Sequence, residues 1–257
     1  MQPAQPMVDI LTALAEQADE LDGLLAGLDE HGFALPSRCP GWSISDVLLH
    51  LAQTNEMAAA SAEGRSTEET AAFRVGDATG ATVDDLVALA VAAGRGRPGK
   101  EVYDRWKAAS AAQAAALAAC EAGTRLRWVA GELAAITLAT TRLAETWIHS
   151  GDVAAGLSRE LTPAARLQPI ARLAWRTLPY AFSRAGKELS GPVALRLTAP
   201  DGTTWEFDPD EPAATTVSGP ALDFCLVAAR RIPPSETGLT ATGPDAADVL
   251  ELVRTFA

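Results

Sequence analysis

Apolar residues recur every three or four positions through most of the first 190 residues of the chain. That spacing is typical of helices that bury one face and expose the other. Gly64 and the segment "GRGRPG" at 94–99 are stop signals between such stretches. The pattern predicts helices over 7–30, 43–64, 82–94, 100–122, 129–157 and, interrupted near Pro169 and Pro179, over 163–188.

Two of these predicted helices have clear start signals. Ser43 is a suitable N-cap, and Asp46 three residues later completes a capping box. Thr82 is a suitable N-cap for the next helix, whose first turn carries acidic residues that favour the helix dipole. The residues between these two helices, 65–80, are polar and are expected to be irregular.

The pattern changes at Gly191, where alternation replaces the helical spacing. Val193, Leu195 and Leu197 alternate with other residues, as in a half-buried strand, and "DG" at 201–202 is a hairpin signal. The chain is therefore predicted to be mainly α, with an all-helical body followed by a small α+β module. Further strands are expected at 203–209, 213–219 and 237–243, and further helices at 219–231 and 244–257.

Composition and charge narrow the class of protein. Hydrophobic residues occupy 48% of the 257 positions, enough for a substantial core, and the net charge is −12. Because nucleic-acid binding needs clustered cations, this acidic chain is not expected to bind nucleic acid. The longest uncharged stretch, 108–120, is too short to span a membrane, and the N-terminus lacks secretory-signal features. Three widely spaced cysteines, an odd number, favour a reducing cytoplasm.

The segment "RLAETWIHSGDVA" at 142–154 places Glu145, His149 and Asp152 at steps of four and three. Residues at this spacing share one face of a helix. The line is either the solvated face, with a minor helix-stabilising Glu–His pair, or a set of metal ligands and proton carriers; considered alone, it favours the solvated face. Arg142, one turn earlier, either binds an anionic substrate or is solvated, and solvation is favoured.

A histidine in another predicted helix changes that assessment. His50 lies among the apolar residues of 47–51, and a buried imidazole needs a hydrogen-bond or metal partner. Two helices of a bundle can bring His50 against Glu145 and His149. Two histidines and a carboxylate are a ligand set of catalytic zinc sites. Asp152 would then accept the free ring N–H of a ligating histidine, unless it is an ordinary surface carboxylate.

Two segments resemble a known family. "PSRCPGWSISDVLLHL" at 36–51 resembles the opening signature of the DinB-like, mycothiol-dependent maleylpyruvate isomerase N-terminal domains. "RLAETWIHSGDVA" resembles their second metal segment, R-x-x-E-x-W-x-H-x-x-D, and "VSGPALDFCLVAARR" at 217–231 resembles the small α+β domain that follows. The resemblance implies a four-helix DinB-like bundle over 1–160, a helical connector over 161–190 and a small domain over 191–257.

The resemblance also implies a chemistry. His50, Glu145 and His149 would bind a divalent metal, most often zinc, and a low-molecular-weight thiol such as mycothiol would be cofactor or co-substrate. A metal cation lowers the pKa of a thiol, so the implied activity is a zinc-dependent thiol S-transferase or isomerase acting on a small electrophilic molecule. The alternative is a non-catalytic bundle with a structural, sensory or ligand-binding role, which a fourth protein ligand would favour.

Three other residues are further candidates. Arg230 and Arg231, at the end of a predicted helix, either meet a carboxylate substrate or are ordinary helix-end cations, and the second interpretation is favoured. Cys39 lies just before the predicted helix that carries His50, near a helix N-terminus, where thiolates are favoured. Its place in "CPGW" nevertheless suggests a packing role.

Overall fold

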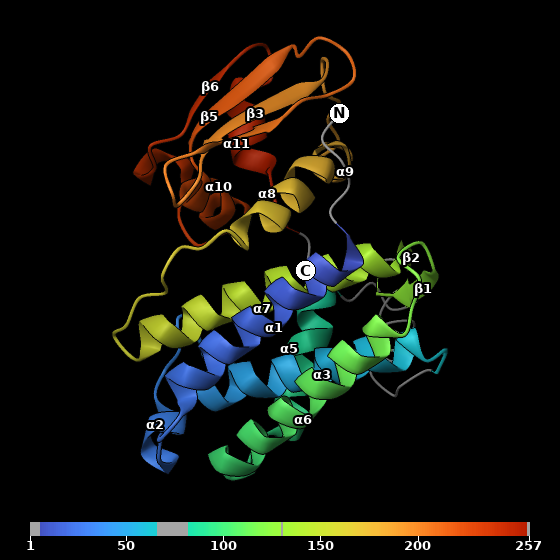
Figure 1. Cartoon of the computed structure of the whole chain (residues 1–257). Coiled ribbons are helices and arrows are strands. Elements are labelled where there is room, and N and C mark those ends of the chain that lie inside the picture. The colour runs from blue at the N-terminus through green and yellow to red at the C-terminus, as the bar shows by residue number, and fades with distance from the viewer. Residues whose placement is uncertain (1–5, 66–81, 130, 256–257) are drawn as a thin grey trace. The chain divides into compact units, whose positions relative to one another are not determined.

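The computed structural model of the chain describes residues 6–65, 82–129 and 131–255. These residues form two compact units, Pro6–Leu161 and a second that begins at Thr162. The first unit is built mainly of helices and the second contains a β-sheet (Figure 1), which confirms the predicted mainly α fold with a small C-terminal α+β part. Within the described ranges, no helix combines the length and the apolar character that crossing a bilayer requires.

Four long helices form a bundle in the first unit: α1 (Met7–Leu25), α3 (Ile44–Ala62), α6 (Gly99–Ala118) and α7 (Ala135–Gly156). Helix α3 packs against α6 and α7, and α1 packs against the same two helices, so the four close around a shared core. Helix α3 is buried on nearly every side, with Leu48 and Leu51 fully inaccessible. A side chain at position 50 therefore lies inside the bundle.

Two shorter helices also belong to the described part of this unit. The five-residue α2 (Glu30–Ala34) follows α1, and α5 (Val83–Gly94) packs against α3. The predicted caps are confirmed, because Ser43 with Asp46 and Thr82 with Asp85 both form complete capping boxes. Of the segment 65–80, which was expected to be irregular, all but the first residue lies outside the described residues.

The predicted end of the first helix and the predicted start of the helix over 129–157 are wrong. The helix expected over 7–30 ends at Leu25, because Gly27 adopts a φ of +82°, a left-handed conformation that ends a helix. The helix expected over 129–157 begins only at Ala135, since the residues before it form the hairpin of β1 (Arg125–Trp128) and β2 (Gly131–Ala134). Gly131 has a φ of +121°, which is open to glycine but not to the residues of a helix.

The second unit begins with α8 (Leu167–Arg176) and α9 (Leu178–Arg184). The interruption predicted near Pro179 is confirmed by a break at Thr177, whereas the one predicted near Pro169 is wrong. Pro169 lies in the first turn of α8, where a backbone N–H has no helical partner and its loss costs little. Pro179 lies in the first turn of α9, as expected for a proline at a helix start.

The sheet of the second unit has the order β4-β3-β5-β6, in which β3 pairs antiparallel with β4 and parallel with β5. The turn at Asp201 and Gly202 joins β3 to β4, as predicted. Helix α10 contacts β3, β5 and α8, and α11 contacts β5, β6 and α9. The elements are β3 (Val193–Thr198), β4 (Thr204–Phe207), β5 (Thr215–Pro220), α10 (Ala221–Ala228), η1 (Pro234–Glu236), β6 (Thr240–Thr242) and α11 (Ala246–Leu252).

Candidate metal centre

His50 on α3 meets Glu145 and His149 on α7 inside the bundle. His50 Nε2 lies 3.2 Å from Glu145 Oε2, and His149 Nε2 lies 3.7 Å from the same oxygen. The two imidazole rings meet edge to face, with centroids 4.8 Å apart. All three side chains are buried, with exposed fractions of 7%, 5% and 8%. The interpretation of this stripe as a solvated face is therefore wrong.

Two of the three donor–donor separations match those around a small metal ion. The three donor atoms all lie within 4.8 Å of one another. Nitrogen and oxygen ligands that bind zinc tetrahedrally at about 2.0 to 2.2 Å lie about 3.4 Å apart. The two measured nitrogen–oxygen distances, 3.2 and 3.7 Å, lie on either side of this value. The donor types and these two separations thus fit zinc.

Burial and the neighbouring charges set the protonation states of this cluster. Burial lowers the pKa of His50, because the imidazolium is poorly solvated inside the bundle. Burial alone would raise the pKa of Glu145, but the hydrogen bond with His50 and the positive charges nearby outweigh it and lower that pKa to about 2. Near neutral pH the cluster therefore offers a neutral His50 imidazole and a Glu145 carboxylate, the forms in which these groups bind metals.

These shifts predict that acid destabilises the metal-free protein in two steps. Between pH 6.5 and the lowered pKa of His50, the unfolded chain binds a proton that the folded chain does not. As the pH decreases through this range, the free energy of unfolding therefore decreases by up to about 1.4 kcal/mol per pH unit. The contribution of Glu145 is complete above pH 4.5 and is lost only as the pH falls toward about 2. Urea unfolding in chelator, from pH 7 to 4.5, measures the first step.

The matched control for this prediction is the exposed histidine of α2, His31. His50→Gln is expected to flatten the pH dependence between 6.5 and 4.5, whereas His31→Gln should leave it unchanged. An unaltered slope in His50→Gln would contradict the assignment of this step to the buried imidazole.

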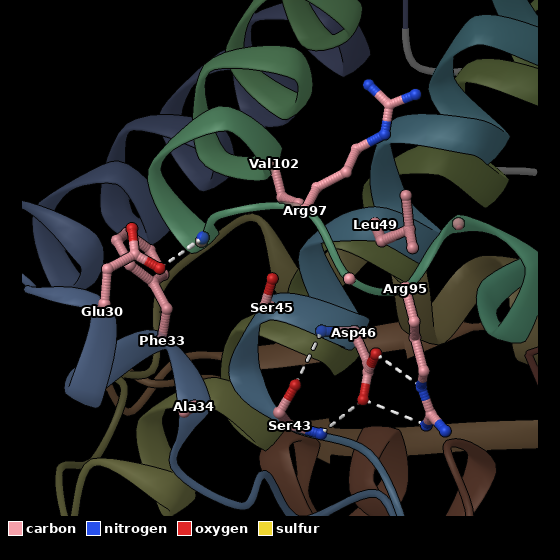
Figure 2. Close-up of a pocket in the computed structure, with 13 residues that line it drawn as sticks. Glu30, Phe33, Ala34, Ser43, Ser45, Asp46, Leu49, Arg95, Arg97 and Val102 are labelled. Atoms are coloured by element: carbon pink, nitrogen blue, oxygen red, sulfur yellow. Dashed lines mark hydrogen bonds and ion pairs between the residues drawn. The ribbon is translucent and has the colours of Figure 1, made fainter.

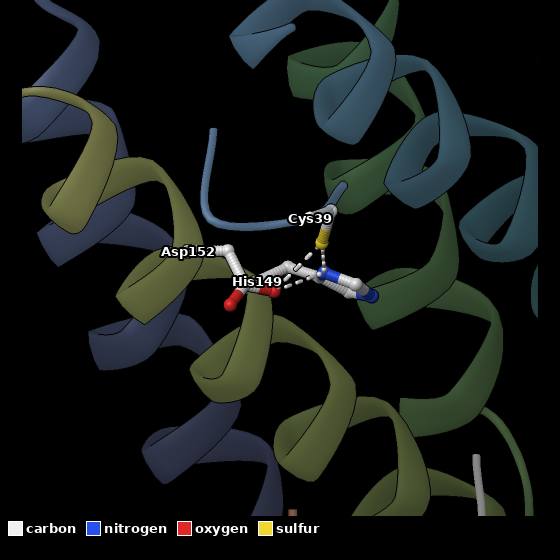
Figure 3. Close-up of side chains that lie close together, drawn as sticks. All are labelled: Cys39, His149 and Asp152. Atoms are coloured by element: carbon white, nitrogen blue, oxygen red, sulfur yellow. Dashed lines mark hydrogen bonds and ion pairs between the residues drawn. The ribbon is translucent and has the colours of Figure 1, made fainter. Parts of the chain in front are cut away.

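The other ring nitrogen of His149 faces a second pair of side chains, shown in Figure 3. Asp152 Oδ2 lies 3.0 Å from His149 Nδ1, so this carboxylate can accept the ring N–H and orient the imidazole. The Cys39 thiol donates to the same oxygen at 3.1 Å, and its sulfur lies 3.9 Å from His149 Nδ1. Asp152 is 1% exposed, which excludes the interpretation of this residue as a surface carboxylate.

Cys39 was a candidate from its sequence position, but its contact with His149 and Asp152 was not predicted. It does pack against the bundle core, as expected, but its sulfur also reaches the stripe of α7. The backbone N–H of Arg38 donates to the Asp152 carbonyl, which ties this loop to α7. The sequence signal was the position of Cys39 in the turn leading into the helix of His50, but no local pattern shows that this turn crosses α7.

Arg142 is buried, so its interpretation as a solvated cation is wrong. Its side chain is 1% exposed and lies one helical turn before Glu145. Burial lowers the pKa of Arg142, yet the guanidinium stays charged at any physiological pH. Its nitrogens donate to three neutral oxygens, those of the side chains of Gln113, Thr54 and Asn55, at 3.1, 2.9 and 3.0 Å. The guanidinium thus contributes positive charge to the bundle interior.

The two arginines predicted near a helix end belong to the second unit. Helix α10 ends at Ala228, and Arg230 follows it with a φ of +59°, in the left-handed region. Arg231 Nη1 donates to the Ala229 carbonyl at 2.9 Å. Both positions match ordinary helix-end cations, and a part for either arginine in substrate binding stays a prediction.

A separate cavity of about 290 Å³ lies between α2, α3 and the turn before α6. Its two carboxylates, those of Glu30 and Asp46, are engaged within the protein, as Figure 2 shows. Arg95 pairs with Asp46, and the Glu30 carboxylate accepts from the backbone N–H groups of Gly99 and Lys100. Because these carboxylates are already engaged, the chemistry of the chain is argued from the buried cluster between α3 and α7.

Comparison with known proteins agrees with this architecture. An uncharacterized protein of Mycobacterium tuberculosis, found in strains CDC 1551 / Oshkosh and ATCC 25618 / H37Rv, is 32% identical over 249 residues, which cover 95% of this chain and 93% of the relative.

Two crystal structures have the same fold, that of a mycothiol-dependent maleylpyruvate isomerase and that of its histidine-to-alanine mutant. Both have a TM-score of 0.61 over 94% of this chain and 96% of theirs, at 19% and 18% sequence identity. The family model for the mycothiol maleylpyruvate isomerase N-terminal domain matches residues 14–154, the segment that contains the whole bundle from α3 to the buried cluster on α7. The chain therefore belongs to the mycothiol maleylpyruvate isomerase N-terminal domain family.

Proposed function

We propose that this protein binds one divalent metal ion, zinc in the first instance, through His50, Glu145 and His149. We further propose that it is an enzyme, a thiol S-transferase or isomerase that acts on a small electrophilic molecule with a low-molecular-weight thiol of the mycothiol type. The observation that carries the proposal is the buried cluster of two imidazoles and a carboxylate, with donor atoms within 4.8 Å, in a bundle of this family.

Each residue of the cluster has a defined task in this proposal. His50 offers a neutral ring nitrogen, His149 offers its Nε2, and Glu145 offers a carboxylate that offsets one of the two charges of a divalent cation. A bound metal would supply the positive charge that lowers the pKa of a thiol. The Asp152 carboxylate holds the His149 ring through Nδ1, which fixes the orientation of the Nε2 lone pair.

The thiol and the electrophile follow from the chemistry that such a centre favours. A thiolate can add to an activated alkene and leave again, which isomerises the double bond, or it can displace a leaving group and form a thioether. The name of the solved structures, mycothiol-dependent maleylpyruvate isomerase, supports a thiol of this type and a small substrate. A reducing cytoplasm is the proposed compartment, where the three cysteines of the chain would remain thiols.

The alternative is a metal with a structural or sensory role in a non-catalytic bundle. A fourth protein ligand would support it, because structural zinc sites are closed by four protein ligands. Among the described residues, no fourth histidine, cysteine or carboxylate joins the group of His50, Glu145 and His149. Asp152 and Cys39 face the other nitrogen of His149. This geometry favours a metal position open to an added thiol or to water.

Cobalt substitution tests the proposal directly. Adding mycothiol or a simple thiol to the cobalt-loaded protein is expected to produce a thiolate–cobalt charge-transfer band, because the thiol binds as its anion. The measurement is made on Cys39→Ser beside the wild type, since Cys39 Sγ lies close enough to His149 to contribute a thiolate of its own. In the variant, any sulfur band must come from the added thiol. An unchanged cobalt spectrum at saturating thiol would reject thiol chemistry at this centre.

A further inference from the structure

His149 lies between two groups of potential metal ligands, one on each side of its ring. Its Nε2 faces Glu145 in the cluster with His50, and its Nδ1 faces Cys39 and Asp152. We propose that Cys39 Sγ, His149 Nδ1 and an Asp152 carboxylate oxygen form a second cation position, selective for thiophilic metals. This proposal goes beyond the function proposed above, and it does not require the chain to be an enzyme.

The second group has the separations of a three-ligand metal site. Its distances are 3.0 Å between His149 Nδ1 and Asp152 Oδ2, 3.1 Å between Cys39 Sγ and that oxygen, and 3.9 Å between the sulfur and Nδ1. For zinc with bonds of about 2.3 Å to sulfur and about 2.0 to 2.2 Å to nitrogen and oxygen, tetrahedral angles give about 3.4 to 3.6 Å for all three pairs. Each measured distance is within about half an ångström of this range, so small side-chain rotations suffice.

The backbone holds Cys39 in place for this role. The side-chain hydroxyl of Ser37 accepts from the Cys39 backbone N–H and donates to the Trp42 carbonyl, which closes the turn between α2 and α3. The N–H of Arg38 donates to the Asp152 carbonyl at 3.1 Å, which fixes the turn to α7. The cysteine is half-buried and its two partners are buried, so Cys39 is the most exposed residue of the group.

Because the two positions share one imidazole, they are expected to differ in metal affinity. A neutral imidazole has one ring nitrogen with a free lone pair and one N–H. Filling both positions therefore requires the ring to lose its N–H proton to water, and the thiol to lose its proton as well. Two cations on opposite sides of one ring also repel each other. When the His50–Glu145–His149 position is filled, we therefore expect the second position to bind at least about tenfold more weakly than the first. It is occupied only when metal is in excess.

The donor set also predicts which metals bind. A thiolate favours zinc, cadmium and monovalent copper, whereas magnesium, calcium and manganese prefer sites built from oxygen ligands. The first position, with two imidazoles and one carboxylate, contains no sulfur. Without added thiol, sulfur-to-metal absorption at this cluster therefore reports on the second position.

Cadmium titration of the zinc-loaded protein in a thiol-free reductant tests the proposal. The expected result is a thiolate–cadmium absorption band that saturates at one added equivalent. Cys39→Ser should abolish it, and Cys120→Ser, which changes another half-buried thiol, should leave it unchanged. His50→Ala breaks the first position and should keep the band, while Asp152→Ala should weaken cadmium binding at least about tenfold.

The outcomes separate this proposal from the one before it. A band that survives Cys39→Ser, or no band in the wild type, would overturn the second position. The second position would also be overturned if Cys39→Ser left cadmium binding unchanged and altered only the rate at which zinc dissociates from the first position. Cys39 would then only position His149. If the wild type does not hold one tightly bound zinc, that result would instead count against the metal centre of the proposed function. The cadmium titration would still test the second position by itself.

Discussion

Replacing His149 with alanine is expected to reduce the metal that the purified protein retains from about one equivalent per chain to almost none. The residue supplies one of three donors in the proposed centre, and its Nε2 lies 3.7 Å from the carboxylate that would share the ion. Removing a partner that only orients a ligand weakens metal binding about ten- to a hundredfold, so removing the ligand itself should exceed that range. Elemental analysis after dialysis against metal-free buffer measures the effect.

The third histidine of the chain provides the control. His31 is exposed in the last turn of α2, away from the buried cluster, so His31→Ala should retain the metal of the wild type. Asp152→Ala should fall between the two variants, because it removes the acceptor of the His149 ring N–H but none of the three proposed ligands. Equal metal contents in His149→Ala and the wild type would reject the ligand assignment.

The same variant separates a catalytic metal from a structural one. The bundle has a large apolar core that includes Leu21, Leu48 and Trp106, each at most 1% exposed. Metal-free His149→Ala should therefore keep its helical circular dichroism signal at room temperature, and only its melting temperature should be lower than that of the wild type. Complete loss of helical signal without metal would favour the structural role.

The candidate centre was accessible from sequence because its information is local. Glu145 and His149 are four residues apart, so helix geometry alone puts them on one face. His50 is surrounded by leucines, so burial of its helix alone makes an interior imidazole. The helix N-caps at Ser43 and Thr82 were predictable for the same reason, because each side chain accepts a hydrogen bond from a backbone N–H only three residues later.

Predictions failed where the outcome depends on distant contacts. The usual rule places the polar stripe of a helix toward solvent, yet the stripe of α7 faces α3 and is buried. Arg142 illustrates the cause, because its hydrogen-bond acceptors come from α3 and α6, at least 29 positions away in the chain. Spacing shows that residues share a face, but only packing decides what that face meets.

The contact that brings the Cys39 turn onto α7 gives a final prediction, and it concerns a glycine. Gly156, the last residue of α7, has no room for a side chain: a Cβ there would lie 2.5 Å from the carbonyl oxygen of Pro36. Because that atom is backbone, the turn itself would have to move, and the strain should outweigh the helical preference of alanine. We expect Gly156→Ala to lower the free energy of unfolding by about 1 to 3 kcal/mol, as measured by urea denaturation.

Gly151 is the matched control for this change. It lies in the same helix and is also half-buried, but a Cβ there would meet only the end of the Leu161 side chain, at 3.9 Å. Gly151→Ala should therefore be neutral or stabilising by up to about 1 kcal/mol, as glycine-to-alanine changes in helices normally are. If the close approach of Pro36 fixes the turn that carries Cys39, Gly156→Ala should also weaken the cadmium binding proposed for Cys39, while Gly151→Ala leaves it unchanged. Equal stabilities of the two variants would show that the turn yields freely, and that its position on α7 is not enforced by this contact.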